Sequence, residues 1–233
     1  MDNLALILVE FVSAVICFVL LRFMMEPYRA TGEGRYLGLP VGFALLGSSY
    51  VFMGLNLYFE SCFSEQLRWV QLFAQAYAFA FLAATYYFSK KPSQHSRLWW
   101  ALTYAGLAFA AVISYLVVFE PPIMGLPSYK TVDEYFRMFN IICLVYISVY
   151  ALRSHASQSN SGTIWFPLGY LLLCFSQYSF LLWSVDSSYS AYLGGHFLRV
   201  ASLLIFLFVT YRVFYVSWGA SKWEGRLDEE TPP

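Results

Sequence analysis

Length, composition and charge place this chain in a membrane before any motif is considered. Its 233 residues are 59% hydrophobic and 21% aromatic, and only 12% are charged. That is more apolar surface than one soluble core of this size normally hides. The formal net charge is zero, so the composition gives no reason to expect nucleic acid as a partner.

Seven apolar windows follow one another along the chain, each long enough to cross a bilayer core of about 30 Å as a helix of roughly 20 residues. We therefore expect an all-α polytopic membrane protein. Residues 1–216 are predicted to form one seven-helix transmembrane domain, with spans at about 4–25, 37–59, 67–88, 98–119, 133–153, 164–185 and 192–216. The polar segment 217–233 is predicted to be a mobile cytoplasmic tail because it is acidic and contains Pro.

The distribution of Lys and Arg favours one orientation in the cell membrane, because basic loops resist translocation. With the N-terminus outside, ten Lys and Arg residues lie on the cytoplasmic side, and Arg68, Lys130 and Arg137 lie outside. Arg199, in the interior of the seventh window, is the one assigned to neither side. The sequence therefore predicts a multi-pass protein with its N-terminus out and its C-terminus in.

Two segments in the first half of the chain are similar in sequence to two segments in the second half. The segment "PVGFALLGSSY" (40–50) aligns with "PLGYLLLCFSQY" (167–178), and "LRWVQLF" (67–73) aligns with "LRVASLL" (198–204). This pattern predicts a parallel three-plus-one-plus-three repeat in which the fourth span is the linker. The alternative is that Pro at span starts and Gly in tightly packed spans recur by chance.

Polar side chains gather in the outer halves of the predicted spans. An Arg at mid-bilayer depth costs at least ~2.5 kcal/mol on insertion scales, so Arg199 should face the bundle and find a partner. Glu10 is the acidic residue at comparable depth, and the first and last helices of a seven-helix ring are usually neighbours. We therefore predict a Glu10–Arg199 pair beside an outward-opening polar cavity. The candidate ligand-binding or polar cluster comprises Glu10, Gln71, Gln75, Arg137, Asn140, Gln177, His196 and Arg199.

Two interpretations of this cluster stay open. Its members bind a ligand or ion, or they only satisfy one another and fix helix packing, with each hydrogen bond contributing ~0.6 kcal/mol. His196 is the candidate for a pH response, because an imidazole titrates near neutral pH.

Several chemistries are excluded by missing residues. The seventh window contains no Lys, so no retinal Schiff base is expected. His95 and His155 fall in predicted cytoplasmic loops, too far from His196 for a bis-imidazole haem site. The chain has no zinc-binding His-Glu-x-x-His helix, nucleophile elbow or phosphate-binding loop. We therefore predict no catalytic residue, no metal site, no cofactor and no enzymatic activity.

Two stretches carry a resemblance to a known family. They are "LGLPVGFALLG" (37–47), within the basic turn and span entry "EPYRATGEGRYLGLPVGF" (26–43), and "LRVASLLIFLFVTYR" (198–212). With them, the chain resembles an uncharacterised archaeal family of seven-helix membrane proteins that are similar to the membrane-embedded sensor domains of prokaryotic signalling proteins. Such domains usually precede an effector, and the sequence shows none, so the resemblance implies a separate protein partner in the membrane or cytoplasm.

Three functions remain open. The first is a stand-alone sensory or small-ligand-binding membrane protein without its own effector domain. The second is an accessory subunit of a larger membrane complex. The third is a small-solute transporter of 3+1+3 topology, which the SWEET sugar carriers resemble; against it, Pro residues are confined to the span entrances at Pro40 and Pro167.

Overall fold

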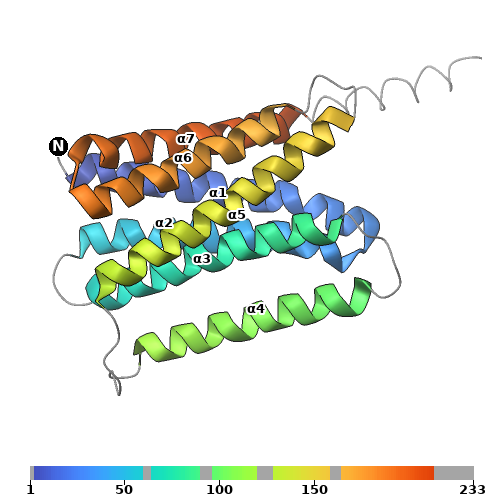
Figure 1. The fold of residues 1–233 in the computed structure, drawn as a ribbon, viewed down its shortest axis with the longest axis horizontal. Coiled ribbons are helices and arrows are strands. Elements are labelled where there is room, and N and C mark those ends of the chain that lie inside the picture. The colour runs from blue at the N-terminus through green and yellow to red at the C-terminus, as the bar shows by residue number, and fades with distance from the viewer. Residues whose placement is uncertain (1–2, 60–63, 90–95, 120–127, 158–163, 213–233) are drawn as a thin grey trace, which may run out of the picture.

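The computed structural model describes residues 3–59, 64–89, 96–119, 128–157 and 164–212 (Figure 1). These residues form seven α-helices and one short 3-10 helix, so the predicted all-α class is confirmed. The elements are α1 (Asn3–Thr31), η1 (Gly34–Leu37), α2 (Gly38–Tyr58), α3 (Ser64–Ser89), α4 (Ser96–Phe119), α5 (Tyr129–Ser157), α6 (Trp165–Asp186) and α7 (Tyr189–Tyr211).

Each helix overlaps one of the seven predicted windows. The largest difference is at the end of α1, which continues to Thr31 rather than stopping near residue 25. Pro27 lies inside this last stretch of α1. The end of the seventh predicted window and the predicted tail, 217–233, lie outside the described residues.

The segment between α1 and α2 is more ordered than the basic turn expected from its sequence. Residues 29–31 are still helical, and Gly32 then adopts a left-handed conformation with φ of 65° while its N–H donates to the carbonyl of Tyr28 at 2.8 Å. Glycine tolerates this left-handed conformation, and helices commonly end at a residue that adopts it. Gly34 follows in η1 directly beneath the Trp100 ring of α4, so the connection is packed against the bundle.

Six of these helices are long and apolar enough to cross a membrane: α1, α2, α4, α5, α6 and α7. The chain is therefore a multi-pass membrane protein embedded in a lipid bilayer. The exception among the described helices is α3, which is 26 residues long but less apolar. It packs against α2, α4 and α5, so neighbouring helices cover much of its surface.

The helices pack mainly with their neighbours in sequence. The most extensive of the other contacts in the described part of the chain are between α1 and α7 and between α3 and α5. Helix α4 lies at the edge of the bundle, where its helix partner is α3 (Figure 1). Two hydrogen bonds join these helices, one between Tyr77 and Ser114 at 2.7 Å and one between Thr85 and Tyr104 at 2.9 Å.

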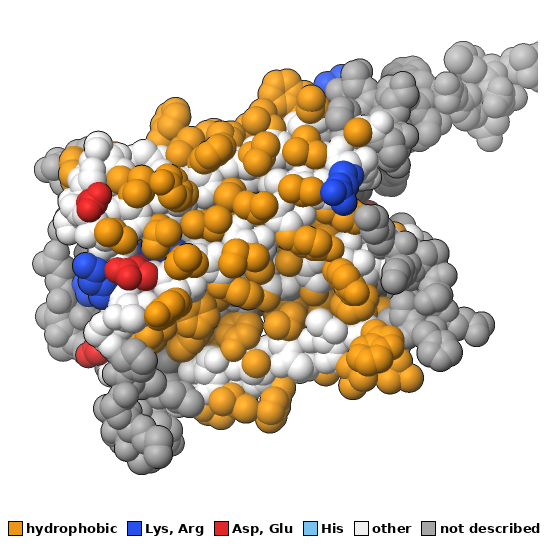
Figure 2. Space-filling view, viewed as in Figure 1, with side chains coloured by type: hydrophobic (Ala, Val, Ile, Leu, Met, Phe, Trp, Pro, Cys, Tyr) orange, Lys and Arg blue, Asp and Glu red, His pale blue; other side chains and the backbone are white. Residues whose placement is uncertain are grey.

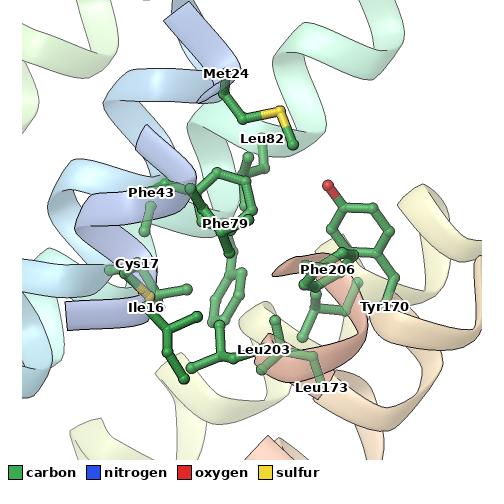
Figure 3. Packing of buried hydrophobic residues seen from close by; sticks show 14 of the residues in the cluster. Ile16, Cys17, Met24, Phe43, Phe79, Leu82, Tyr170, Leu173, Leu203 and Phe206 are labelled. Carbon is green, nitrogen blue, oxygen red and sulfur yellow. The ribbon is translucent and has the colours of Figure 1, made fainter. Parts of the chain in front are cut away.

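The centre of the bundle is apolar. Phe79 of α3, Phe206 of α7 and Tyr170 of α6 lie among buried residues of α1, α2 and α5 (Figure 3). Small residues allow this close packing. An added Cβ on Gly42 would lie 2.7 Å from Leu82 of α3, and one on Gly169 would lie 2.7 Å from the Phe206 ring of α7. Substitution at either glycine therefore requires its neighbour to move.

The outer surface is also apolar, as expected for a protein surrounded by lipid. Large hydrophobic side chains are exposed along the helices, including Leu8, Phe109, Ile142 and Phe197. On the face shown in Figure 2, the coloured charged side chains lie toward the two ends of the bundle, with hydrophobic side chains between them. This distribution matches a membrane core flanked by two polar surfaces.

Candidate functional site

The centre of the candidate site is a three-residue ionic cluster between α1 and α7. Arg199 Nη2 lies 2.6 Å from Glu10 Oε1 and 2.9 Å from His196 Nδ1, and His196 Nδ1 lies 3.3 Å from Glu10 Oε1. All three residues are buried, with exposed fractions of 0% for Glu10, 5% for His196 and 3% for Arg199. The predicted Glu10–Arg199 pair is confirmed. We name these three residues the buried triad.

Local sequence places these side chains on facing surfaces. His196 and Arg199 are three positions apart in α7, so both project from one side of that helix. Gly54 of α2 lies opposite Glu10, and a Cβ added there would be 3.5 Å from the Glu10 Cβ. The missing side chain lets α2 approach α1 closely at the depth of the carboxylate.

Hydroxyl groups on α6 and α7 set the rotation of α7. The Ser176 hydroxyl donates to the Gly195 carbonyl at 2.8 Å, and the Ser202 hydroxyl donates to the Gly169 carbonyl at 2.7 Å. Both contacts join α6 to α7. Because they hold one face of α7 against α6, the adjoining face that carries Arg199 is directed at α1.

Aromatic rings surround the cation and the imidazole. The guanidinium carbon of Arg199 lies 4.4 Å from the ring centroid of Tyr50 on α2 and 5.8 Å from that of Phe180 on α6. The His196 ring contacts Tyr192 and Phe180 edge to face, with centroids 4.5 Å and 5.0 Å away. Cation–π contacts of this kind are worth ~2 kcal/mol or more where water is excluded. They compensate part of the cost of burying Arg199.

Hydrogen bonding in the buried triad is incomplete. Glu10 Oε2, His196 Nε2, Arg199 Nε and the Tyr50 hydroxyl are buried and have no hydrogen-bond partner among the described residues. Most buried polar atoms in proteins are paired, and leaving one unpaired costs ~1–3 kcal/mol. Four such atoms around a single ion pair are therefore a candidate binding locus.

A second polar group lies on α5 and α6. Arg137 pairs with Asp133 at 2.7 Å, and Asn140 Nδ2 lies 3.5 Å from Gln177 Oε1. Asn140 Oδ1 and Gln177 Nε2 are buried without partners in the described part of the chain. The guanidinium carbon of Arg137 is 5.3 Å from the Phe180 ring centroid. Phe180 thus contacts both Arg137 and the buried triad.

The structure brings six of the eight predicted cluster residues into these two groups. The other two, Gln71 and Gln75, lie on α3, where Gln71 is half-buried and Gln75 is buried. Neither joins the hydrogen bonds of the two groups among the described residues. Gln71 and Gln75 share one face of α3, as expected from their spacing of four residues.

The sequence analysis did not predict the aromatic residues that surround the buried triad. Tyr50, Phe180 and Tyr192 belong to an aromatic content that is mostly ordinary packing and interfacial anchoring, so no signal distinguished them. Ser176 and Ser202 were also missed. Each of these serines lies close in sequence to a predicted cluster residue, Gln177 or Arg199, and that proximity is the only available signal.

The chemistry available at the buried triad is ionic and acid–base. Among the described residues, no three His, Cys, Asp or Glu side chains are grouped to hold a metal ion. No family model, curated protein or solved structure matches this chain. The functional argument therefore rests on the geometry of the site.

Proposed function

We propose that this chain is a sensory or small-ligand-binding protein of the cell membrane, with the buried triad as its binding residues. The single observation that carries the proposal is the set of four unpaired polar atoms around the Glu10–Arg199 pair. They supply a carboxylate acceptor, a guanidinium donor, an imidazole nitrogen and a hydroxyl at one place. Ionisable residues inside a membrane are rare, and many of them mark ion, proton or substrate sites.

The proposal includes seven membrane spans, with α3 as the seventh. Its lower hydropathy is compatible with a span because α2, α4 and α5 pack around it. The internal repeat supports the same arrangement. Gly42 and Gly169, which align in the two halves, each pack against the third helix of their own half. The contacts of α1 with α7 and of α3 with α5 are equivalent if the halves are related by two-fold pseudosymmetry.

The proposed orientation has the N-terminus outside and the C-terminus in the cytoplasm. Its support is the distribution of Lys and Arg in the sequence. In this orientation the buried triad lies in the outer half of the membrane, since Glu10 is near the start of α1 and His196 is near the start of α7. A signal received there would pass to a separate protein partner in the membrane or cytoplasm, as the resemblance to sensor domains suggests.

Native mass spectrometry of the protein, purified in a mild detergent, tests this function. The wild-type protein should carry a bound small molecule. The double variant Glu10→Gln/Arg199→Gln, which leaves no unpaired buried charge, should lose it. The control Arg22→Gln changes an exposed arginine of α1 and should retain it.

Native mass spectrometry and a transport assay together separate the alternatives. A stoichiometric membrane subunit without a small molecule would support an accessory subunit and overturn the sensory proposal. Counterflow of a solute after reconstitution into liposomes would support a transporter. No small molecule and no dependence on the triad would leave packing as the role of these residues.

A further inference from the structure

His196 Nδ1 faces two groups of opposite hydrogen-bonding character. Arg199 Nη2, 2.9 Å away, can only donate, whereas Glu10 Oε1, 3.3 Å away, can only accept when ionised. The same carboxylate oxygen also accepts a hydrogen bond from Arg199 Nη2 at 2.6 Å. One imidazole nitrogen is therefore within reach of a donor and an acceptor at once.

This arrangement provides a partner for His196 Nδ1 in both protonation states. When the imidazole is neutral, Nδ1 accepts from Arg199 and the ring proton resides on Nε2. When a proton adds to Nδ1, the new N–H can donate to Glu10 Oε1, and the Arg199 hydrogen bond to Nδ1 is lost. Only one proton is transferred, from solvent to Nδ1, and no covalent bond within the protein breaks.

The charged groups around His196 attract or repel the imidazolium that proton uptake would form. Glu10 on α1 is the anion, and Arg199 on α7 and Arg137 on α5 are cations that act on the imidazole. Asp133 pairs with Arg137 and offsets part of that cation's charge. The groups facing the site from α2 and α6, Tyr50 and Phe180, are uncharged rings. An imidazolium would therefore be attracted by Glu10 and repelled by Arg199 at short range.

We propose that the buried triad is a proton-binding site in which His196 Nδ1 exchanges its hydrogen bond from Arg199 for one to Glu10. This inference rests on the proposed function, because it adds a proton to the ligands of that site and makes the site sensitive to pH. Proton uptake weakens the attachment of Arg199 to His196 and leaves the guanidinium with Glu10 and the Tyr50 ring. Because His196 belongs to α7 and Glu10 to α1, the protonated state adds a hydrogen bond between these two helices.

Nuclear magnetic resonance of the full chain, labelled with 15N at His and Arg and placed in lipid nanodiscs, tests the proposal. The chain contains three His, and the variant His196→Gln assigns the signals of His196 by their disappearance. In alkaline solution His196 should carry its proton on Nε2. On acidification it should become doubly protonated, and the side-chain signal of Arg199 should shift over the same pH range.

Two variants of opposite effect make the test specific. Removing the anion in Glu10→Gln should move proton uptake by His196 about one pH unit or more toward acid. Removing a cation in Arg137→Gln should move it the other way. The control Glu26→Gln, at an exposed position of α1, should leave it unchanged. If one variant fails to fold, the other still gives a signed result.

The proposal is overturned if His196 remains in one protonation state while His95 and His155 titrate. It is also overturned if neither charge variant moves the His196 signal, or if Nδ1 carries the proton in alkaline solution. A bound small molecule together with a non-titrating His196 would reject the proton and leave the proposed ligand-binding function standing. A titrating His196 with no change at Arg199 would reject the coupling between them.

Discussion

Glu10 Oε1 and Arg199 Nη2 lie 2.6 Å apart across a sequence separation of 189 residues, and this ion pair connects the first described helix to the last. Both side chains are almost completely buried. A buried ion pair adds little net stability over an apolar pair. Removing one partner is costly, however, because it leaves the other charge buried without a counter-ion. The pair therefore makes the α1–α7 contact dependent on the charge of each member.

Replacing Glu10 by Gln should destabilise the protein by about 3–5 kcal/mol, because the Arg199 cation is left without its counter-ion in the bundle. Unfolding by sodium dodecyl sulfate in mixed micelles provides the measurement. The matched variant Glu26→Gln, at an exposed position of the same helix, should change stability by less than about 0.5 kcal/mol.

The double variant Glu10→Gln/Arg199→Gln should recover a large part of the loss, because it removes the stranded cation. Equal stability of Glu10→Gln and the wild type would contradict the ion pair. An additive loss in the double variant would show that the two residues act independently.

Adjacent glycines in α7 should respond differently to substitution. In Gly195→Ala the new Cβ would lie 2.8 Å from the Phe180 ring, whereas a Cβ at Gly194 meets nothing within 4 Å among the described residues. Overpacking of this kind costs about 1–3 kcal/mol. We expect that loss in Gly195→Ala and no loss in Gly194→Ala, measured by the same unfolding assay. Similar stabilities for the two variants would contradict the close contact between α6 and α7.

Hydropathy predicted the helices because six of them are apolar over a membrane-spanning length. It predicted their ends less well. The helix α1 continues through Pro27 to Thr31, although the sequence there becomes polar, because hydropathy reports the membrane boundary and not the end of the helical hydrogen bonds. The position of α3 among three other helices was also not predictable, since hydropathy carries no information about which helices become neighbours.

The part of the candidate site that could be predicted is the part that depends on how deep each residue lies in the membrane. Counting residues from the span ends placed Glu10 and Arg199 at the same height, and the need of a buried cation for an anion joined them. Depth does not give the rotation of a helix about its axis. The same counting placed Gln75 at a similar depth, yet among the described residues it does not join the hydrogen bonds of the buried triad. Tyr50 reaches Arg199 without any distinguishing feature in sequence. Rotation is set by packing contacts such as Ser202 on the Gly169 carbonyl.

Helix α4 should be attached to the bundle largely through α3. Removing both hydroxyls in Tyr77→Phe/Tyr104→Phe eliminates the hydrogen bonds to Ser114 and Thr85 and the hydrogen bond of Tyr104 with the Gly38 backbone. At ~0.6 kcal/mol for each bond, we expect amide hydrogen exchange across α4 to increase by about three- to twenty-fold. Exchange in α6 and α7 should not change and serves as the internal control. A uniform increase throughout the protein would instead indicate global destabilisation.

The orientation of the protein is the last prediction, because it decides from which side the buried triad receives a proton or ligand. Basic residues are concentrated in the loops expected on the cytoplasmic side, including Arg29, Lys90 and Lys91. Protease added to intact cells should therefore remove an epitope tag at the N-terminus and spare one at the C-terminus, and permeabilised cells should lose both. Reducing the charge bias, with Arg29, Lys90 and Lys91 all changed to Gln, leaves seven basic residues against three and should add a minor population in which the N-terminal tag is protected. Protection of the N-terminal tag in intact wild-type cells would place the triad in the cytoplasmic half and make the interior of the cell the source of its proton.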